Sequence, residues 1–108
     1  LAYMRNHRGR VTTTDYVLVE VGNWLSRTDD RPSFVALMRQ LESDTELTVV
    51  PGSRELFEQG YELYKARTDK AWSLTDCISF VVMEQMGLSE ALTADRHFGQ
   101  AGFTVLLA

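Results

Sequence analysis

The sequence predicts a single α/β domain in which a mainly parallel sheet is flanked by helices on both faces. Short β-rich segments alternate with amphipathic segments along the whole chain, as parallel strands joined by helical crossovers do. The chain has 108 residues, 44% of them hydrophobic, which is enough for one core and too few for two domains. No internal repeat or linker divides it, so we expect one domain over residues 1–108.

Four β-rich segments are expected as strands: residues 10–14, 47–50, 91–93 and 103–107. Pro51-Gly52 closes the second of these segments, because this pair favours a turn. The first residues, 2–7, are expected to form the end of a helix that stops at Gly9.

The segments between the strands are expected as helices. The first is capped by Thr14 or Asp15, and Val17, Val21, Trp24 and Leu25 recur at helical spacing and should face the core. The next contains Pro32 in its first turn and the apolar stripe Phe34, Leu37, Met38 and Leu41. Ser53 and Ser73 are expected to cap two further helices, Gly87 to end the second of them, and a short helix to follow Asp95.

Composition excludes several classes of protein. The net charge of −4, from 11 basic and 15 acidic residues, argues against a broad basic surface for nucleic acid, but not against an enzyme that reaches phosphate through a metal. One cysteine and two histidines argue against disulfides and a Cys/His zinc site. The lone cysteine and the lack of an apolar run of membrane-spanning length favour a cytoplasmic protein without a membrane contact.

Three acidic residues are candidates for a shared metal site. Asp95 follows an expected strand, at the sheet edge where open α/β sheets bind ligands. Asp76 begins a helix and Glu20 lies within one, and both segments can reach the same edge. Converging carboxylates suggest a divalent cation and phosphate chemistry. Asn23 shares a helix face with Glu20, and Thr93 lies two residues before Asp95, so these two are candidates for positioning a carboxylate or substrate.

Each acid also has a plainer explanation. Ser73 and Asp76 have the spacing of a capping box, Asp95 could be an ordinary N-cap, and Glu20 could be a solvated edge residue. A capping carboxylate is held rigidly and ionised, so capping and metal binding are compatible.

Other reactive or aromatic side chains are expected to have structural roles. His97 should pack or cap within the short helix rather than act as a general base, and Cys77 should be a small core residue. Trp24 and Trp72 are expected to pack in the core or at its rim rather than stack on bases.

Three stretches together resemble the PIN-domain family, and within it the VapC-type toxins of bacterial and archaeal toxin–antitoxin pairs. They are residues 13–23 (TTDYVLVEVGN), 73–80 (SLTDCISF) and 92–98 (LTADRHF), the last followed by Ala101-Gly102-Phe103. Their acids are Glu20, Asp76 and Asp95, in that order, and the resemblance covers the chain from Arg10 onward.

The resemblance implies a PIN-like three-layer α/β/α fold and a metal-dependent endoribonuclease. By this resemblance, the catalytic residues of this chain would be Glu20, Asp76 and Asp95, which would hold Mg²⁺ or Mn²⁺. In enzymes of this kind the ion activates a water for in-line attack on the phosphodiester, and the reaction leaves a 5′-phosphate. It also implies an RNA substrate (tRNA, rRNA or mRNA), a cognate antitoxin protein and a homodimer.

The chain departs from the family pattern at its start. The family's first segment is a strand that ends in an aspartate and is followed by a helix, and no such segment is found here. We therefore expect the domain to be N-terminally incomplete, with three of four acids and with the neighbouring strands lacking a central partner. This leaves open a non-catalytic PIN-like protein-binding module. A receiver domain is less favoured because it needs a late lysine, and none follows Lys70.

Overall fold

The computed structural model describes residues 3–5, 11–92 and 96–105. The helices and strands in chain order are β1 (Tyr3–Arg5), β2 (Val11–Thr14), α1 (Asp15–Arg27), α2 (Arg31–Ser43), β3 (Leu47–Val50), α3 (Arg54–Ala66), α4 (Leu74–Met86), β4 (Glu90–Leu92), α5 (Arg96–Gln100) and β5 (Thr104–Val105). Within these residues, every helix falls short of the length and apolar character needed to cross a membrane.

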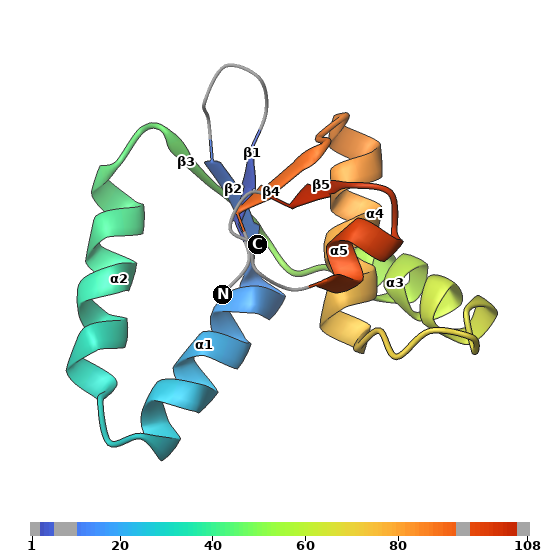
Figure 1. Cartoon of the computed structure of the whole chain (residues 1–108). Coiled ribbons are helices and arrows are strands. Elements are labelled where there is room, and N and C mark those ends of the chain that lie inside the picture. Colours follow the sequence, from blue (N-terminus) through green and yellow to red (C-terminus); the bar gives the residue numbers. More distant parts are fainter. Residues whose placement is uncertain (1–2, 6–10, 93–95, 106–108) are drawn as a thin grey trace.

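The five strands form one sheet in the order β3-β2-β1-β4-β5. Strands β2 and β3 pair in parallel, as do β4 and β5, while β1 runs antiparallel to both β2 and β4. Four strands therefore share one direction. Helices α1 and α2 lie on one side of this sheet and α3, α4 and α5 on the other (Figure 1), as right-handed crossovers require. The predicted α/β class is confirmed.

The segment at residues 2–7, expected to end a helix, instead contributes β1 to the middle of the sheet. Met4 pairs with Thr12 of β2 on one side and with Ala91 of β4 on the other. The helix prediction is wrong because so short a segment has little preference of its own, and pairing on both sides satisfies backbone groups of three strands. For the same reason, the neighbouring strands have the central partner they were expected to lack.

Local capping explains where three helices begin and one ends. The side chains of Thr14, Ser53 and Ser73 accept hydrogen bonds from the free backbone N–H groups of α1, α3 and α4. Gly87, with φ of +67°, ends α4 in the left-handed conformation that glycine adopts most easily. These predicted boundaries are confirmed.

Helix α4 is the centre of the hydrophobic core. Its buried residues are Cys77, Ile78, Ser79, Phe80, Val82 and Met83. The ring of Phe80 packs edge-on against Trp72 and Phe98, with ring centroids 4.9 and 4.8 Å apart. Such aromatic pairs add about 0.5–1.5 kcal/mol each to the gain from burying their area. The core thus fixes α4 between the sheet, α3 and α5.

The side of the sheet that carries α1 and α2 buries less. Val17 and Leu18 of α1 and Leu41 of α2 are buried, but Trp24 is 58% exposed. The prediction that Trp24 faces the core is wrong because the joined ends of α1 and α2 extend away from the sheet (Figure 1). Packing of Trp72, which is buried, is as predicted.

Helix α3 crosses α4 at very close range through Gly60. A Cβ atom added to Gly60 would collide with Cγ1 of Ile78 and lie 3.1 Å from its Cα. Because Ile78 is itself fixed in the core, neither atom has room to move. The crossing therefore requires glycine at position 60.

Gly60→Ala is expected to lower the free energy of unfolding by about 1–3 kcal/mol, since overpacking at the crossing outweighs the higher helix propensity of alanine. Urea unfolding followed by circular dichroism measures the change. Gly22→Ala in α1 is the matched control, because the atoms nearest to its added Cβ would belong to the Phe34 ring, at 3.3 Å. Equal losses in the two variants would contradict a requirement specific to Gly60.

Candidate functional site

Four helices begin at one edge of the sheet, the edge to which the carboxyl ends of β2, β3 and β4 point. Helices α1, α3 and α5 follow these strands directly. The start of α4 reaches the same edge, because its Asp76 contacts His97 in α5. Helix starts concentrate free N–H groups and partial positive charge, so this edge suits carboxylates and phosphates.

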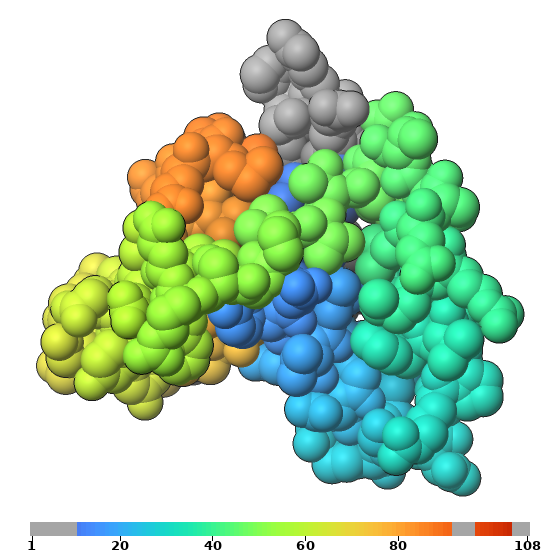
Figure 2. Space-filling view, turned by 180° about the vertical axis from the view of Figure 1, so that it is seen from behind, coloured from blue at the N-terminus to red at the C-terminus, as the bar shows by residue number. Residues whose placement is uncertain are grey.

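The turns after β2 and β3 are tied to each other at this edge. The carboxylate of Asp15 accepts a hydrogen bond from Gly52 N at 2.8 Å. The Tyr16 hydroxyl accepts from Ser53 N at 3.2 Å and donates to Ser53 O at 3.0 Å. Figure 2 shows the segment that leaves β3 lying across the start of α1. Sequence reasoning missed these bonds because the partners are 37 residues apart.

Asp76 closes the predicted capping box. Ser73 Oγ accepts from Asp76 N at 3.0 Å, and Asp76 Oδ2 accepts from Ser73 N at 3.2 Å. The plainer explanation of this acid is therefore confirmed. The side chain of Asp76 is only 16% exposed, so capping also fixes the carboxylate in one position.

His97 provides a second partner for the same oxygen. Its Nδ1 lies 3.0 Å from Asp76 Oδ2, and since an ionised carboxylate only accepts, Nδ1 is the donor. Described residues make no hydrogen bond to Asp76 Oδ1. One carboxylate oxygen is thus held by the fold, while the other can take a ligand. The sequence predicts packing or capping for His97 within the short helix, but not this contact with Asp76.

The structure shows no hydrogen bond between Asp76 and the other predicted site residues that it describes. Glu20 and Asn23 are exposed on α1, which packs against α4. Asp95 and Thr93 lie outside the described residues. Residues 3–5, 11–92 and 96–105 contain no group of three acidic, histidine or cysteine side chains close enough to share a metal ion. Of the two predicted ligands among the described residues, Glu20 and Asp76, Asp76 is the one held in a defined contact, with His97.

Cys77, next to Asp76, has the properties of a core residue. Its side chain is fully buried. Burial, assisted by the negative charge of Asp76, raises the pKa of the Cys77 thiol. The raised pKa leaves less thiolate at any given pH than a free cysteine has, which favours a core residue over a nucleophile.

Comparison with known proteins identifies the family. The PIN domain model matches residues 2–104. The chain belongs to the PIN domain family. It is 30% identical over 93 residues to the 23S rRNA-specific endonuclease VapC20 of Mycobacterium tuberculosis, in strains CDC 1551 / Oshkosh and H37Rv, over 86% of this chain and 70% of the relative.

The structural match agrees with the sequence match. The crystal structure of Mycobacterium tuberculosis VapC20, described as a Sarcin-Ricin loop cleaving toxin, matches this PIN domain with a TM-score of 0.78 at 28% identity. The match covers 88% of this chain and 72% of that chain. The resemblance read from the acids at Glu20, Asp76 and Asp95 is thus confirmed at the level of the family and the fold.

Ser73→Ala is expected to lower the free energy of unfolding by about 1 kcal/mol, because the N–H of Asp76 loses its acceptor. Chemical denaturation measures this loss. Ser89→Ala, at an exposed serine between α4 and β4, is the control and should change stability by less than about 0.5 kcal/mol. Equal stability of the two variants would contradict a stabilising cap.

The thiol of Cys77 is expected to react with Ellman's reagent far more slowly in the folded chain than in urea. Its raised pKa means less thiolate at any given pH, so the pH profile of the reaction should shift upward on folding. Rates measured between about pH 7 and 10 give both profiles. Cys77 is the only cysteine in the sequence, so the reaction in urea gives the full signal of one thiol. If the pH profiles of the folded and unfolded chain coincide, the pKa of Cys77 is not raised by folding.

Proposed function

We propose that this PIN domain is a metal-dependent endoribonuclease of the VapC-like toxin type, which hydrolyses RNA phosphodiester bonds at the edge where α1, α4 and α5 begin. The observation that carries the proposal is the fixed carboxylate of Asp76 at this edge, in a chain similar to an rRNA endonuclease. Open α/β sheets commonly bind their ligands at this edge, outside the carboxyl ends of the strands.

The donor set fits a hard divalent cation. Carboxylate oxygens are the ligands that Mg²⁺ and Mn²⁺ prefer, and Asp76 keeps Oδ1 available while Oδ2 is held. Asp76, Glu20 and Asp95 would hold the ion, with Glu20 reaching it from α1. When bound, the ion supplies positive charge for the phosphoryl oxygens and polarises water.

The chain's own residues do the positioning. Ser73 holds Asp76 through the capping box, and the His97 ring fixes its carboxylate plane from α5. Such supporting hydrogen bonds commonly matter about 10–100-fold for metal affinity or activity. Asn23, exposed three residues after Glu20 on α1, and Thr93 are the proposed substrate-positioning residues.

The similarity also guides the proposed substrate and partners. Because VapC20 is named a 23S rRNA-specific endonuclease, rRNA is favoured over tRNA and mRNA as the substrate class. We further propose a cognate antitoxin protein, a homodimer and a cytoplasmic location, as expected for a VapC-like toxin.

A second candidate is a non-catalytic PIN-like binding module. It is favoured by the complete explanation of Asp76 as a helix cap and by the lack of a three-ligand cluster among the described residues. The two functions differ in metal binding, since a module without chemistry has no need to bind Mn²⁺ at Asp76.

Incubation with a mixed pool of rRNA fragments and tRNA in Mn²⁺ is expected to produce cleavage that EDTA abolishes. Asp76→Asn should lower the cleavage rate by about two orders of magnitude or more, because a charged ligand is lost while asparagine keeps an oxygen for the cap. Gel analysis of the RNA ends measures the rate.

Asp29→Asn is the matched control. Asp29 has φ of +58° in an exposed turn, a conformation that asparagine also tolerates, so the same loss of charge should leave cleavage unchanged. Mn²⁺ titration by calorimetry completes the design. If the chain shows no cleavage and binds no Mn²⁺, the nuclease is rejected in favour of the binding module.

A further inference from the structure

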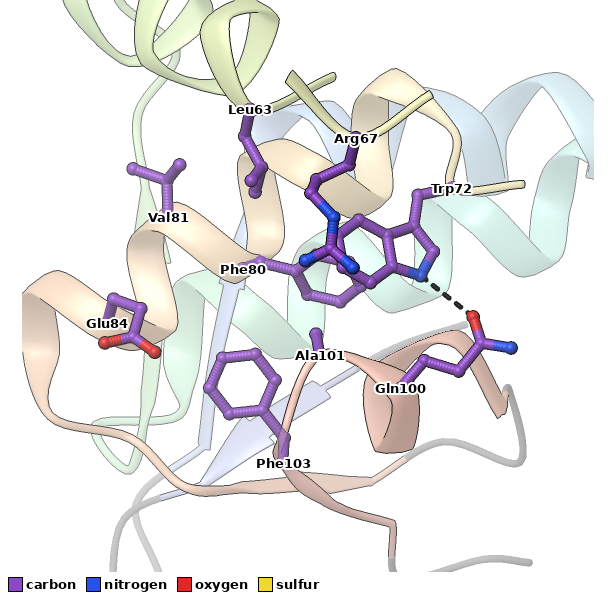
Figure 3. Close-up of a pocket in the computed structure, with 9 residues that line it drawn as sticks. All are labelled: Leu63, Arg67, Trp72, Phe80, Val81, Glu84, Gln100, Ala101 and Phe103. Atoms are coloured by element: carbon purple, nitrogen blue, oxygen red, sulfur yellow. Dashed lines mark hydrogen bonds between the residues drawn. The ribbon is translucent and has the colours of Figure 1, made fainter. Parts of the chain in front are cut away.

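A cavity of about 320 Å³ lies between the end of α3, helix α4 and the segment from α5 to β5 (Figure 3). Aromatic rings of Trp72, Phe80 and Phe103 form much of its wall. Phe103 packs on Phe80 with ring centroids 5.7 Å apart and planes inclined by 33°. Trp72 and Phe80 are themselves buried, so the partly exposed ring of Phe103 and the guanidinium of Arg67 are the flat surfaces that a ligand in the cavity would meet.

Two opposite charges stand at the wall of this cavity. The guanidinium of Arg67 lies 4.9 Å over the Trp72 ring, where Asp69 holds it by hydrogen bonds of 3.0 and 3.1 Å. Figure 3 shows the carboxylate of Glu84 away from Arg67, with Phe80 between them. A ligand in the cavity would meet a cation at one side and an anion at the other.

The carboxylate of Glu84 has no hydrogen-bond or ion-pair partner among the described residues. Beside apolar rings, it gains most from a ligand that donates N–H groups to both of its oxygens. Glu84 is exposed, so water pairs with its carboxylate when no ligand is bound, and an aliphatic or purely aromatic side chain would offer no N–H groups to replace that water. The cavity therefore favours a flat ligand with two adjacent N–H donors on one edge.

The cavity adjoins the proposed catalytic edge. Trp72, just before α4, donates from Nε1 to Gln100 Oε1 at 3.0 Å, and Asp76, in the first turn of α4, contacts His97 at 3.0 Å, so two side-chain bonds reach α5 from this region. His97 and Gln100 are three residues apart, a rise of about 4.5 Å on a helix. Glu84, at the other side of the cavity, lies eight residues after Asp76 on α4, a rise of about 12 Å, so a base held there would belong to a nucleotide that neighbours the phosphodiester at Asp76.

We propose that this cavity binds an unstacked guanine base of the RNA substrate. Guanine is flat and presents N1–H and the 2-amino group side by side, which matches the two oxygens of Glu84. Stacking on aromatic and guanidinium planes combined with edge hydrogen bonds is how proteins read single-stranded RNA. The proposal rests on the proposed ribonuclease function, for which it names a specificity pocket.

Binding of nucleoside monophosphates in EDTA tests the cavity separately from catalysis. Trp24→Phe leaves Trp72 as the only tryptophan, so its fluorescence reports ligands in the cavity. All four monophosphates carry the same phosphate, and GMP is expected to quench Trp72 at concentrations about tenfold below AMP, CMP and UMP. Glu84→Gln in this background should remove that preference, since the amide offers one acceptor oxygen in place of two.

Glu42→Gln, at an exposed glutamate of α2, is the matched control and should leave GMP binding unchanged. Equal binding of the four monophosphates, or a GMP preference that survives Glu84→Gln, would overturn the proposal. Tighter binding of N-acetylphenylalanine amide than of GMP would also overturn it, in favour of a protein side chain as the occupant.

Cleavage assays separate the two proposals. Guanine-dependent quenching without any RNA cleavage would support the pocket and count against the ribonuclease. Metal-dependent cleavage with the same sites and rates in the parent chain and Glu84→Gln would support the ribonuclease and count against the pocket. Loss of the preference for sites next to guanine in Glu84→Gln, with cleavage retained elsewhere, is the result expected if both are right.

Discussion

Burial of helix α4 is the constraint on which the rest of this PIN domain depends. Its apolar side chains point in nearly every direction, so the helix must be covered on all sides. Helix α3 covers it through the close approach of Gly60 to Ile78, and α5 through the contact of Phe98 with Phe80. Because α4 cannot shift within these contacts, its first turn is fixed relative to the sheet edge.

That first turn links stability to chemistry through one side chain. Asp76 stabilises α4 as a capping residue, and the same bonds, together with that from His97, hold its carboxylate in one position at the sheet edge. The partial positive charge at a helix start favours the ionised carboxylate, the form that a cation also requires. The demands of folding and of metal binding therefore agree here, which explains why a cap and a ligand can be one residue.

Local sequence signals predicted much of this architecture. Ser73 and Asp76 show their capping spacing within four residues, and the alternation of strands and helices gives the fold class. What could not be predicted depends on partners distant in the chain: the pairing of β1 on both sides, the exposure of Trp24 and the bond from His97 to Asp76. Propensity describes a segment by itself, whereas these features are decided by what packs against it.

The contact between the start of α4 and helix α5, here called the seam, joins the proposed catalytic edge to the cavity. Two side-chain bonds cross it, from Trp72 to Gln100 and from Asp76 to His97. The net charge of −4 means that the domain has no overall excess of positive charge to attract RNA phosphates. In the proposed function, recognition would come from a few local contacts, and an RNA strand lying along the seam would meet a carboxylate edge and an aromatic cavity in succession. The proposed nuclease would thus select RNA by a base and a cation rather than by the overall field of the domain.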